Sequence, residues 1–461
     1  MHFMQPPSVC LRQPAPASGS LMVCRSRYHG EATMAGMSST ANRLTHIAAF
    51  PHALGTGIIV SGSQPIPPDL HDRMVQSIER FEAVFSRFRS DSLIGRIANG
   101  NVGNCNVGGS FGFPDPQTAE ALFTLYDRLF AATGGAMDPT VGEELTRLGY
   151  GADLTFSMDG PDQIVTLHDR IIPPDQSDQS DLSAPSSQTA PSGRLTWAAI
   201  THHSGALTVP GPVRLDFGAA GKGMMIDLLA HMIERELPGC EYVVDAGGDL
   251  RARIDSPIQV ALEDPDDQTR AIGVAEITSG SFCASAPSRR HWRVRSAEGA
   301  ITRAHHLLNA LDGQPVDDVK ATWVYVPTVM NNSEAPDCDA GADAEMLDNR
   351  VYADAEPGNA SPGNAKPDNA STGASIDNAK PDNAKRGNDD PIAANSAIDI
   401  ASRFPTALAD GLATSLFVAD PSALAEAFSS DDGAPMFQCA LMLPDRTAGA
   451  SAAFPARFFT T

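Results

Sequence analysis

The segment 331–400 is the feature that most limits what this 461-residue chain can fold into. It carries 14 acidic and 5 basic side chains, a net charge of −9, and Tyr352 is its only aromatic residue. It also repeats itself, because Asn364–Ala370 recurs as Asn378–Ala384. Burial of so little apolar surface cannot offset a backbone entropy of ~1–2 kcal/mol per residue, so we expect disorder. A strand pattern precedes the segment and a helix pattern follows it, which favours an inserted loop over a domain linker.

Two further stretches lack apolar periodicity. Residues 172–194 consist mainly of Pro, Ser, Gln and Asp, and we expect a second disordered loop there. Residues 1–45 are predicted to be a disordered leader. The cost of closing a loop grows only with the logarithm of its length, so one fold tolerates both insertions. We therefore predict a single α+β domain over 46–461.

The rest of the chain alternates helix and strand patterns. Helices are expected from 67 to 88, from 117 to 132 and after Gly221, because apolar residues recur there at steps of three and four. A further helix is expected around 410–414. Strands are predicted at 54–60, 242–246, 258–262, 272–277, 322–326 and 437–443.

Charge excludes several classes of partner. The net charge of −23 repels phosphate backbones and anionic lipids, so nucleic acid is not an expected partner. No apolar run reaches the ~18 residues that span a bilayer. Seven scattered cysteines without a CxxC pair argue against a disulfide framework and a structural zinc site. The segment Leu21–Cys24 lacks the apolar run of a lipoprotein signal, so the cytoplasm is the default location and an extracytoplasmic one stays open.

Two glycine-rich segments could bind a ligand. Leu215–Gly223 leads into a predicted helix, where backbone N–H groups and Lys222 could approach a phosphate. It is not a P-loop, since Gly223 stands where a magnesium-binding Ser or Thr is required, and a plain helix start remains the alternative. Tyr242–Arg251 is a strand followed by a Gly-Gly turn, and a tight turn is the simpler interpretation.

Two other segments carry side chains suited to catalysis. Asp410 and Thr414 share one helix face at a spacing of four, and hard oxygen ligands of this kind suit Mg²⁺. The alternative is a surface aspartate and a threonine bonded to its own helix. His305 and His306 precede the turn 312–315, where a histidine is either a general base or a polar strand end.

The order of these segments carries more information than any one of them. Along the chain follow 85–92, 133–142, 216–227, 245–249, 278–280, 306–316 and 410–414. In motif type, order and spacing this series resembles the ApbE family, the FAD-dependent protein FMN transferases. The resemblance covers residues 47–461 outside the two insertions.

The resemblance implies an ApbE-like α+β fold that binds FAD in a cleft. It implies Mg²⁺-dependent transfer of FMN from FAD to a Ser or Thr hydroxyl of an acceptor protein, with release of AMP. The acceptor would carry a flavinylation motif, and a membrane-associated flavoprotein is one such partner. Two alternatives stay open: an FAD pyrophosphatase giving FMN and AMP, and a non-catalytic FAD-binding protein.

The resemblance also assigns residues. It implies that Mg²⁺ is held by Asp410, Thr414 and the backbone carbonyl of Ala219, and that His306 activates the acceptor hydroxyl. Contacts to flavin and nucleotide carry over to Leu54, Phe88, Ala136, Met137, Asp138, Asp216, Lys222, Leu308 and Ala413. The chain departs from the family pattern at Asn309-Ala310, where Asp-Pro is usual, and at Ser281–Ser285. The first departure puts a second metal site in doubt.

Overall fold

The computed structural model describes residues 44–100, 108–151, 195–295, 301–328 and 400–459, together with two short strands at 26–27 and 164–166. The expected insertions 172–194 and 331–400 lie outside the described residues, apart from the last position of the second. So does the expected leader, except for its last two residues and the strand Ser26–Arg27.

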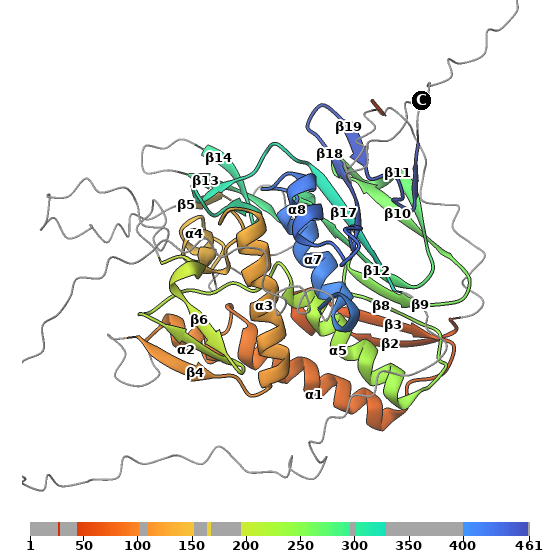
Figure 1. The fold of residues 1–461 in the computed structure, drawn as a ribbon, viewed down its shortest axis with the longest axis horizontal. Helices are drawn as coiled ribbons and strands as arrows, with labels where there is room; N and C mark the ends of the chain where they lie inside the picture. Colours follow the sequence, from red (N-terminus) through yellow and green to blue (C-terminus); the bar gives the residue numbers. More distant parts are fainter. Residues whose placement is uncertain are drawn as a thin grey trace, which may run out of the picture. The chain divides into compact units, whose positions relative to one another are not determined.

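Most helices of the described chain precede residue 242 or follow residue 327, and the described chain between 236 and 405 forms a run of strands (Figure 1). The helices are α1 Pro68–Phe85, α2 Leu93–Ala98, α3 Pro116–Ala132, α4 Gly142–Arg147, α5 Gly221–Glu236, α7 Pro405–Ser415 and α8 Pro421–Ala427, with 3-10 turns at Ala53–Gly55, Pro139–Val141, Trp197–Ala199 and Pro287–Arg289. The strands of the largest sheet are β1 Ser26–Arg27, β2 His46–Phe50, β3 Ile58–Gly62, β8 Tyr242–Asp245, β9 Leu250–Arg253, β12 Gly280–Ser285, β17 Ala321–Pro327, β18 Gln438–Met442 and β19 Thr447–Ala450. The other strands are β4 Gly109–Gly112, β5 Ile164–Thr166, β6 Thr201–His203, β7 Ala206–Val209, β10 Ile258–Asp264, β11 Asp267–Ile277, β13 His291–Arg295, β14 Ile301–His305, β15 Leu308–Asn309, β16 Gln314–Pro315 and β20 Ala456–Phe458. None of the helices in the described residues is long and apolar enough to cross a bilayer.

A nine-stranded antiparallel sheet organises the fold. Its strand order is β1-β19-β18-β17-β12-β9-β8-β3-β2, with β12 and β17 near the middle. The sequence does not predict β1, which pairs Ser26 with Ala448 at one edge.

Both faces of the central strands are buried. Side chains alternate across a strand, so Cys283 and its partner Val324 face the core that α1, α3, α5 and α7 cover. Phe282 and its partner Tyr325 face the opposite core, which the small sheet β10-β11-β20 covers. Helices α1, α3, α5 and α7 therefore all lie on one face of the sheet.

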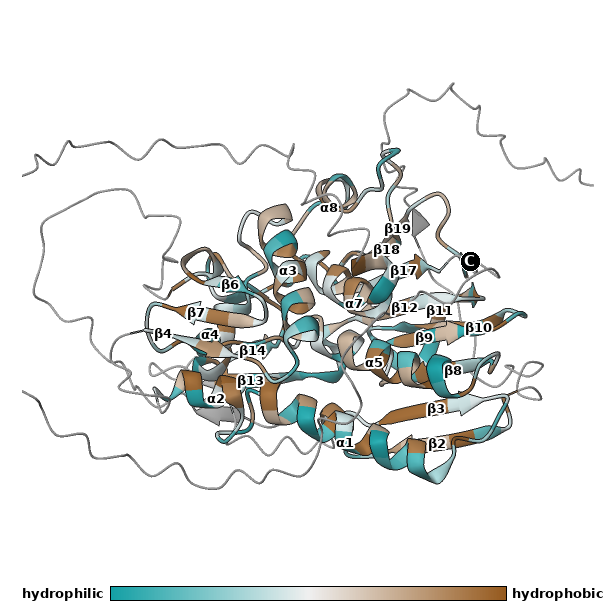
Figure 2. Cartoon of the chain, turned by 60° about the horizontal axis from the view of Figure 1, so that its bottom comes forward, coloured by the Kyte–Doolittle hydropathy of each residue, from teal (hydrophilic) through white to brown (hydrophobic). Residues whose placement is uncertain are grey.

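Helix α1 is amphipathic, as its spacing predicts. Leu70, Met74, Ile78 and Phe81 are buried, and the two colours alternate along α1 in Figure 2. The helix ends at Phe85 and not at Phe88, because Ser86 turns into an extended conformation (φ −79°, ψ 112°). Phe88 therefore lies in a turn.

Helix α7 is buried on nearly every side. Of its residues Pro405–Ser415, Thr414 alone is not fully buried. Small residues allow this close packing: a Cβ on Gly411 would lie 2.8 Å from Leu129 of α3. The expected helix at 410–414 is confirmed and extends further toward the N-terminus.

The expected strand at 54–60 is only half right. Leu54 has a φ of 52°, a left-handed conformation incompatible with a strand, and its N–H donates to Glu82 at 2.7 Å. Gly55 and Gly57 also have positive φ, and the strand begins at Ile58. The Leu and Gly pattern therefore encodes a turn before the strand.

His202 links α3 to the β6–β7 hairpin and makes stability depend on pH. Its ring nitrogens lie 2.9 Å from Glu120 and 3.0 Å from Asp127, and its side chain is 11% exposed. Burial lowers the pKa of His202, but the hydrogen bonds and charges of Asp127 and Glu120 outweigh it, and the pKa is raised. The ion pairs therefore stabilise the fold fully below pH ~6.5 and are lost as pH rises through the raised pKa.

We predict that His202→Gln destabilises the protein more at pH 6 than at pH 9, by about 1 kcal/mol, because charge-assisted hydrogen bonds are lost only at the lower pH. Urea unfolding at both pH values measures the difference. His203→Gln, at the exposed neighbour, is the control. An equal cost at both pH values would contradict the role of the charged form.

Candidate active site

Asp410 lies in the buried middle of α7 and is held by the first turn of α5. The N–H of Gly223 donates to Asp410 Oδ2 at 3.0 Å, and Lys222 Nζ lies 3.0 Å from Oδ1 and 3.2 Å from Oδ2. Glycine is required at 223, because a Cβ there would lie 2.3 Å from the carbonyl oxygen of Thr406. The two helices therefore meet backbone to backbone beside this carboxylate.

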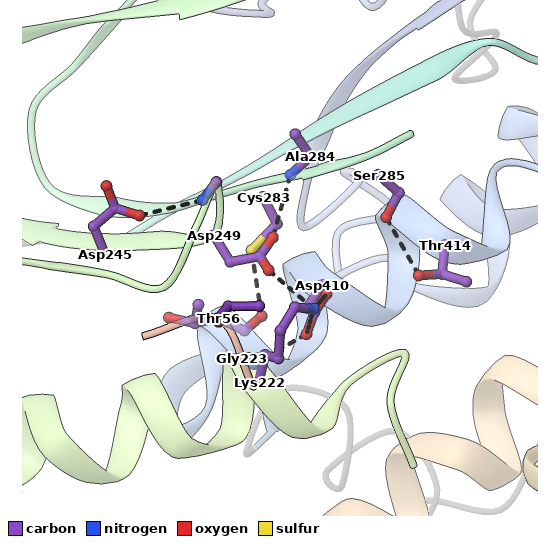
Figure 3. A network of polar contacts seen from close by, with 12 residues as sticks. Thr56, Lys222, Gly223, Asp245, Asp249, Cys283, Ala284, Ser285, Asp410 and Thr414 are labelled. Atoms are coloured by element: carbon purple, nitrogen blue, oxygen red, sulfur yellow. Dashed lines mark hydrogen bonds and ion pairs between the residues drawn. The ribbon is translucent and has the colours of Figure 1, made fainter. Parts of the chain in front are cut away.

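A second buried carboxylate shares the same lysine. Asp249, which follows the Gly-Gly turn after β8, places Oδ2 3.0 Å from Lys222 Nζ and accepts the N–H of Ala284 at 3.3 Å. Figure 3 shows Lys222 between Asp249 and Asp410. Two buried negative charges thus surround one positive charge, and their sum is −1.

The imbalance raises the pKa of Asp410. Burial raises it first and the charge of Asp249 adds to the effect, while Lys222 and the N–H of Gly223 offset both only in part, so that the pKa reaches about 7. Buried charges of unequal number favour binding of a further cation. The cluster is therefore suited to a metal ion.

Thr414 lies one helical turn beyond Asp410. Its hydroxyl is 3.3 Å from Ser285 Oγ of β12, and Thr322 Oγ1 of β17 donates to the carbonyl of Ala413 at 2.6 Å. Hydroxyl groups of two central strands therefore fix the C-terminal end of α7, which explains the buried position of Ala413.

The carbonyl of Ala219 is the third oxygen in question. It lies before the N-cap of α5, and the N–H of Gly223, four residues further on, donates to Asp410. The described residues contain no group of three or more His, Cys, Asp or Glu side chains that could hold a metal ion. A cation here would combine one carboxylate with a hydroxyl and a carbonyl, as Mg²⁺ does when water and phosphate complete its shell. These three donors fit Mg²⁺ by chemistry and charge.

His306 follows β14 and points its Nδ1 at a carbonyl. The Nδ1 atom is 3.3 Å from the carbonyl oxygen of Arg290, which can only accept, so Nδ1 carries the proton and Nε2 the lone pair. Burial, followed by the charge of Arg290, lowers the pKa of His306 to about 3. The imidazole is therefore neutral at cellular pH.

Aromatic rings form a wall beside His306. Tyr150 lies 6.3 Å from His306, stacks on Trp292 at 5.4 Å and meets Phe88 edge-on at 5.3 Å between ring centroids. Arg87 lies over both Phe88 and Tyr150, with its guanidinium carbon 4.1 and 4.5 Å from their centroids. Phe88 is 46% exposed, so one face of this wall is open to a planar ligand.

His305 faces elsewhere. It is buried, and its Nε2 lies 3.6 Å from Asp317 while its Nδ1 accepts the N–H of Leu307. The two adjacent histidines therefore differ in surroundings, and only His306 adjoins the aromatic wall. Leu308 packs in the same cluster as Tyr150 and Trp292.

Residues 136–138, which are predicted to contact the ligand, form a buried turn next to the end of β15. The N–H of Ala310 donates to the carbonyl of Ala136 at 2.9 Å, and the N–H of Met137 donates to Thr133 at 2.9 Å. Asp138 accepts hydrogen bonds from Thr140, so its carboxylate serves the turn. A flavin contact by Asp138 stays a prediction.

Asp216 lies in the segment before α5, and Leu54 lies in the 3-10 turn Ala53–Gly55. Asp216 accepts the N–H of Gly218 and pairs with Arg87 Nε at 2.6 Å. The turn that holds Leu54 meets the Gly-Gly turn before Asp249, because Thr56 packs on Gly247. Figure 3 draws Thr56 close to Lys222.

The structure brings most of the predicted residues into two groups, and Leu54 belongs to neither. Lys222, Asp410, Ala413 and Thr414 lie at the α5–α7 contact, while Phe88, Ala136, Asp216, His306 and Leu308 lie at the aromatic wall or next to its residues. Ala219 lies two residues before α5, and Met137 and Asp138 follow Ala136 in the buried turn. Sequence reasoning missed Asp249, Tyr150, Trp292 and Arg87 as site residues. A carboxylate directly after a buried strand and a Gly-Gly turn could have indicated Asp249.

We predict that Arg87→Met costs about 3 kcal/mol of unfolding free energy, because it leaves Asp216 unpaired in a largely buried place. The two side chains are only 10% and 15% exposed. Arg73→Met is the matched control, since Arg73 and its partner Asp69 are 40% and 72% exposed, and it should cost less than ~1 kcal/mol. Denaturant unfolding measures both, and equal costs would refute a structural role for the Arg87 pair.

Comparison with known proteins gives consistent matches. The model of the ApbE family matches residues 53–348. An FAD:protein FMN transferase of Klebsiella pneumoniae is 25% identical over 238 residues, which cover 50% of this chain and 59% of the relative. One of Escherichia coli K12 is 23% identical over 268 residues, or 57% of this chain and 68% of the relative.

The fold also matches solved structures. The flavin transferase ApbE from Vibrio cholerae superposes with a TM-score of 0.53 at 16% identity, over 88% of this chain and 97% of that one. At this identity the match shows the fold alone. The expected α+β fold is confirmed.

Proposed function

Because this chain belongs to the ApbE family, we propose that it transfers the FMN half of FAD to a Ser or Thr hydroxyl of an acceptor protein and releases AMP. Relatives named FAD:protein FMN transferase support the activity. One observation carries the proposal for this chain: the buried Asp410 shares Lys222 with Asp249, which leaves a negative site beside the hydroxyl of Thr414.

We propose that Asp410, Thr414 and the carbonyl of Ala219 hold Mg²⁺, which would neutralise the diphosphate of FAD when bound. If Asp410 bound a cation, Lys222 would keep Asp249 as an ion-pair partner, so the charge of the lysine would stay compensated. Phe88, which is 46% exposed, offers a stacking surface for the flavin ring, and the buried Tyr150 supports it edge-on.

The transfer step needs a base for the acceptor hydroxyl. Its oxygen forms a bond to the phosphorus of the FMN half, the bridging P–O bond breaks, and AMP leaves with the electron pair. The proton of the hydroxyl goes to Nε2 of His306, which the hydrogen bond of Nδ1 to Arg290 leaves as the acceptor. Burial is the main cause that lowers the pKa of His306, and the positive charges of Arg290 and Lys222 add to it. Negative charge arriving with FAD opposes these charges and so favours the protonation.

Incubation of the full chain with FAD, Mg²⁺ and an acceptor domain tests the proposal. The acceptor carries a Ser or Thr flavinylation motif, as a membrane-associated flavoprotein would. We expect covalent flavin fluorescence on the acceptor and one AMP for each flavin attached. AMP release without the acceptor would indicate an FAD pyrophosphatase, and FAD binding without AMP would indicate a non-catalytic protein.

We predict that His306→Gln lowers kcat for transfer by about 10²–10⁴-fold, the usual contribution of a general base. His305→Gln is the matched control, since that ring faces Asp317 and should change kcat only a few-fold. Single-turnover measurement of flavin attachment separates the chemical step from product release. If both variants lose activity equally, His306 is not the base.

A further inference from the structure

Asp227 has contacts that the proposed transfer does not use. It lies on α5, one turn beyond Gly223, and is fully buried. Its Oδ2 accepts the N–H groups of Thr406 and Ala407, each at 2.9 Å, and its Oδ1 lies 2.9 Å from Arg251 Nη1. A carboxylate of one helix thus binds the first turn of another.

This contact replaces an ordinary helix cap. Helix α7 begins at Pro405, and the residue before it, Phe404, makes no side-chain cap. The N–H groups of a buried first turn need acceptors, and a negative charge near a helix N-terminus is favourable. Asp227 provides both from outside the helix.

The same helix face also binds Asp410. Gly223 and Asp227 are four residues apart on α5, and they contact Asp410 and the pair Thr406–Ala407, one turn apart on α7. Two adjacent turns of α5 are therefore joined to two adjacent turns of α7. Ser281 of β12 adds a contact to the same end, 2.7 Å from Thr406 Oγ1.

From this geometry we infer that Asp227 is a positioning residue for the cation site, because it fixes α7 so that Asp410 meets Lys222 and Gly223. The inference rests on the proposed metal role of Asp410. Loss of the carboxylate would let α7 shift along α5, and the oxygens of Asp410 and Thr414 would lose their common position. Metal affinity should respond more than FAD binding.

Glu234, the second partner of Arg251, provides a control for the loss of a buried charge on α5. It pairs with Asp227 through Nη1 and with Glu234 through Nη2 at 3.1 Å. Glu234 lies on the same helix, but its described contacts are with Arg251, Arg253 and Tyr242 and not with α7. Glu234→Gln therefore removes a partner of Arg251 and leaves the start of α7 intact.

The test is a Mn²⁺ titration of the full chain, in which electron paramagnetic resonance measures free and bound Mn²⁺. Asp227→Asn should weaken Mn²⁺ binding by roughly tenfold or more, the usual effect of losing a group that orients a ligand. Glu234→Gln should leave it within about twofold, and Asp410→Asn should abolish it. In the transfer assay, raised Mg²⁺ should restore kcat of Asp227→Asn, with KM for FAD nearly unchanged.

The outcomes separate the two claims. If the wild-type protein binds Mn²⁺ and Asp227→Asn binds it equally well, the positioning role is wrong and the proposed function stands. If the wild-type protein binds no Mn²⁺, both fall. If Asp227→Asn does not fold, Asp227→Glu, which keeps the charge but moves the carboxylate that accepts the N–H groups of Thr406 and Ala407, takes its place: weaker Mn²⁺ binding than in the wild type supports the inference, and unchanged binding overturns it.

Discussion

One lysine shared by two buried carboxylates is the interaction on which the site depends. Lys222 bridges Asp249, at the end of a sheet turn, and Asp410, in the middle of a buried helix. Neither carboxylate would be stable as an unpaired buried charge. The arrangement therefore joins the β8–β9 turn, α5 and α7 at one point.

The burial of α7 follows from this need for fixed geometry. A helix that packs on every side needs small side chains, and α7 has Ala or Gly at 407, 409, 411 and 413. Small side chains bring its backbone close to its neighbours, but they do not fix the position of the helix along its axis. Hydrogen bonds fix that position at both ends, from Asp227 and Ser281 to the first turn and from Thr322 and Ser285 to the last.

The sequence predicted periodic elements well and local turns poorly. The expected helices at 117–132 and after Gly221 are confirmed, because amphipathic spacing over several turns is a strong signal. The start of the strand expected from Leu54 was wrong. The apolar residues and glycines of 54–57 fit a strand pattern, but Leu54, Gly55 and Gly57 adopt positive φ values and form a turn. The spacing of Asp410 and Thr414 predicted that they lie on one helix, which the structure confirms, and their metal role stays a prediction. Asp249 was indicated only by its place after a buried strand and a Gly-Gly turn. Tyr150 was not indicated, because it joins the site through contacts between segments distant in sequence.

The structure also changes the electrostatic argument that the sequence suggested. The sequence offered Lys222 and the start of α5 as positive charge for a diphosphate within a chain of net charge −23. In the structure the lysine is already outnumbered by Asp249 and Asp410, so with both carboxylates ionised the protein groups alone sum to −1 and oppose an anionic dinucleotide. With a divalent cation at Asp410 the sum would be +1. On this argument the two carboxylates do not weaken anion binding; they make it conditional on the metal.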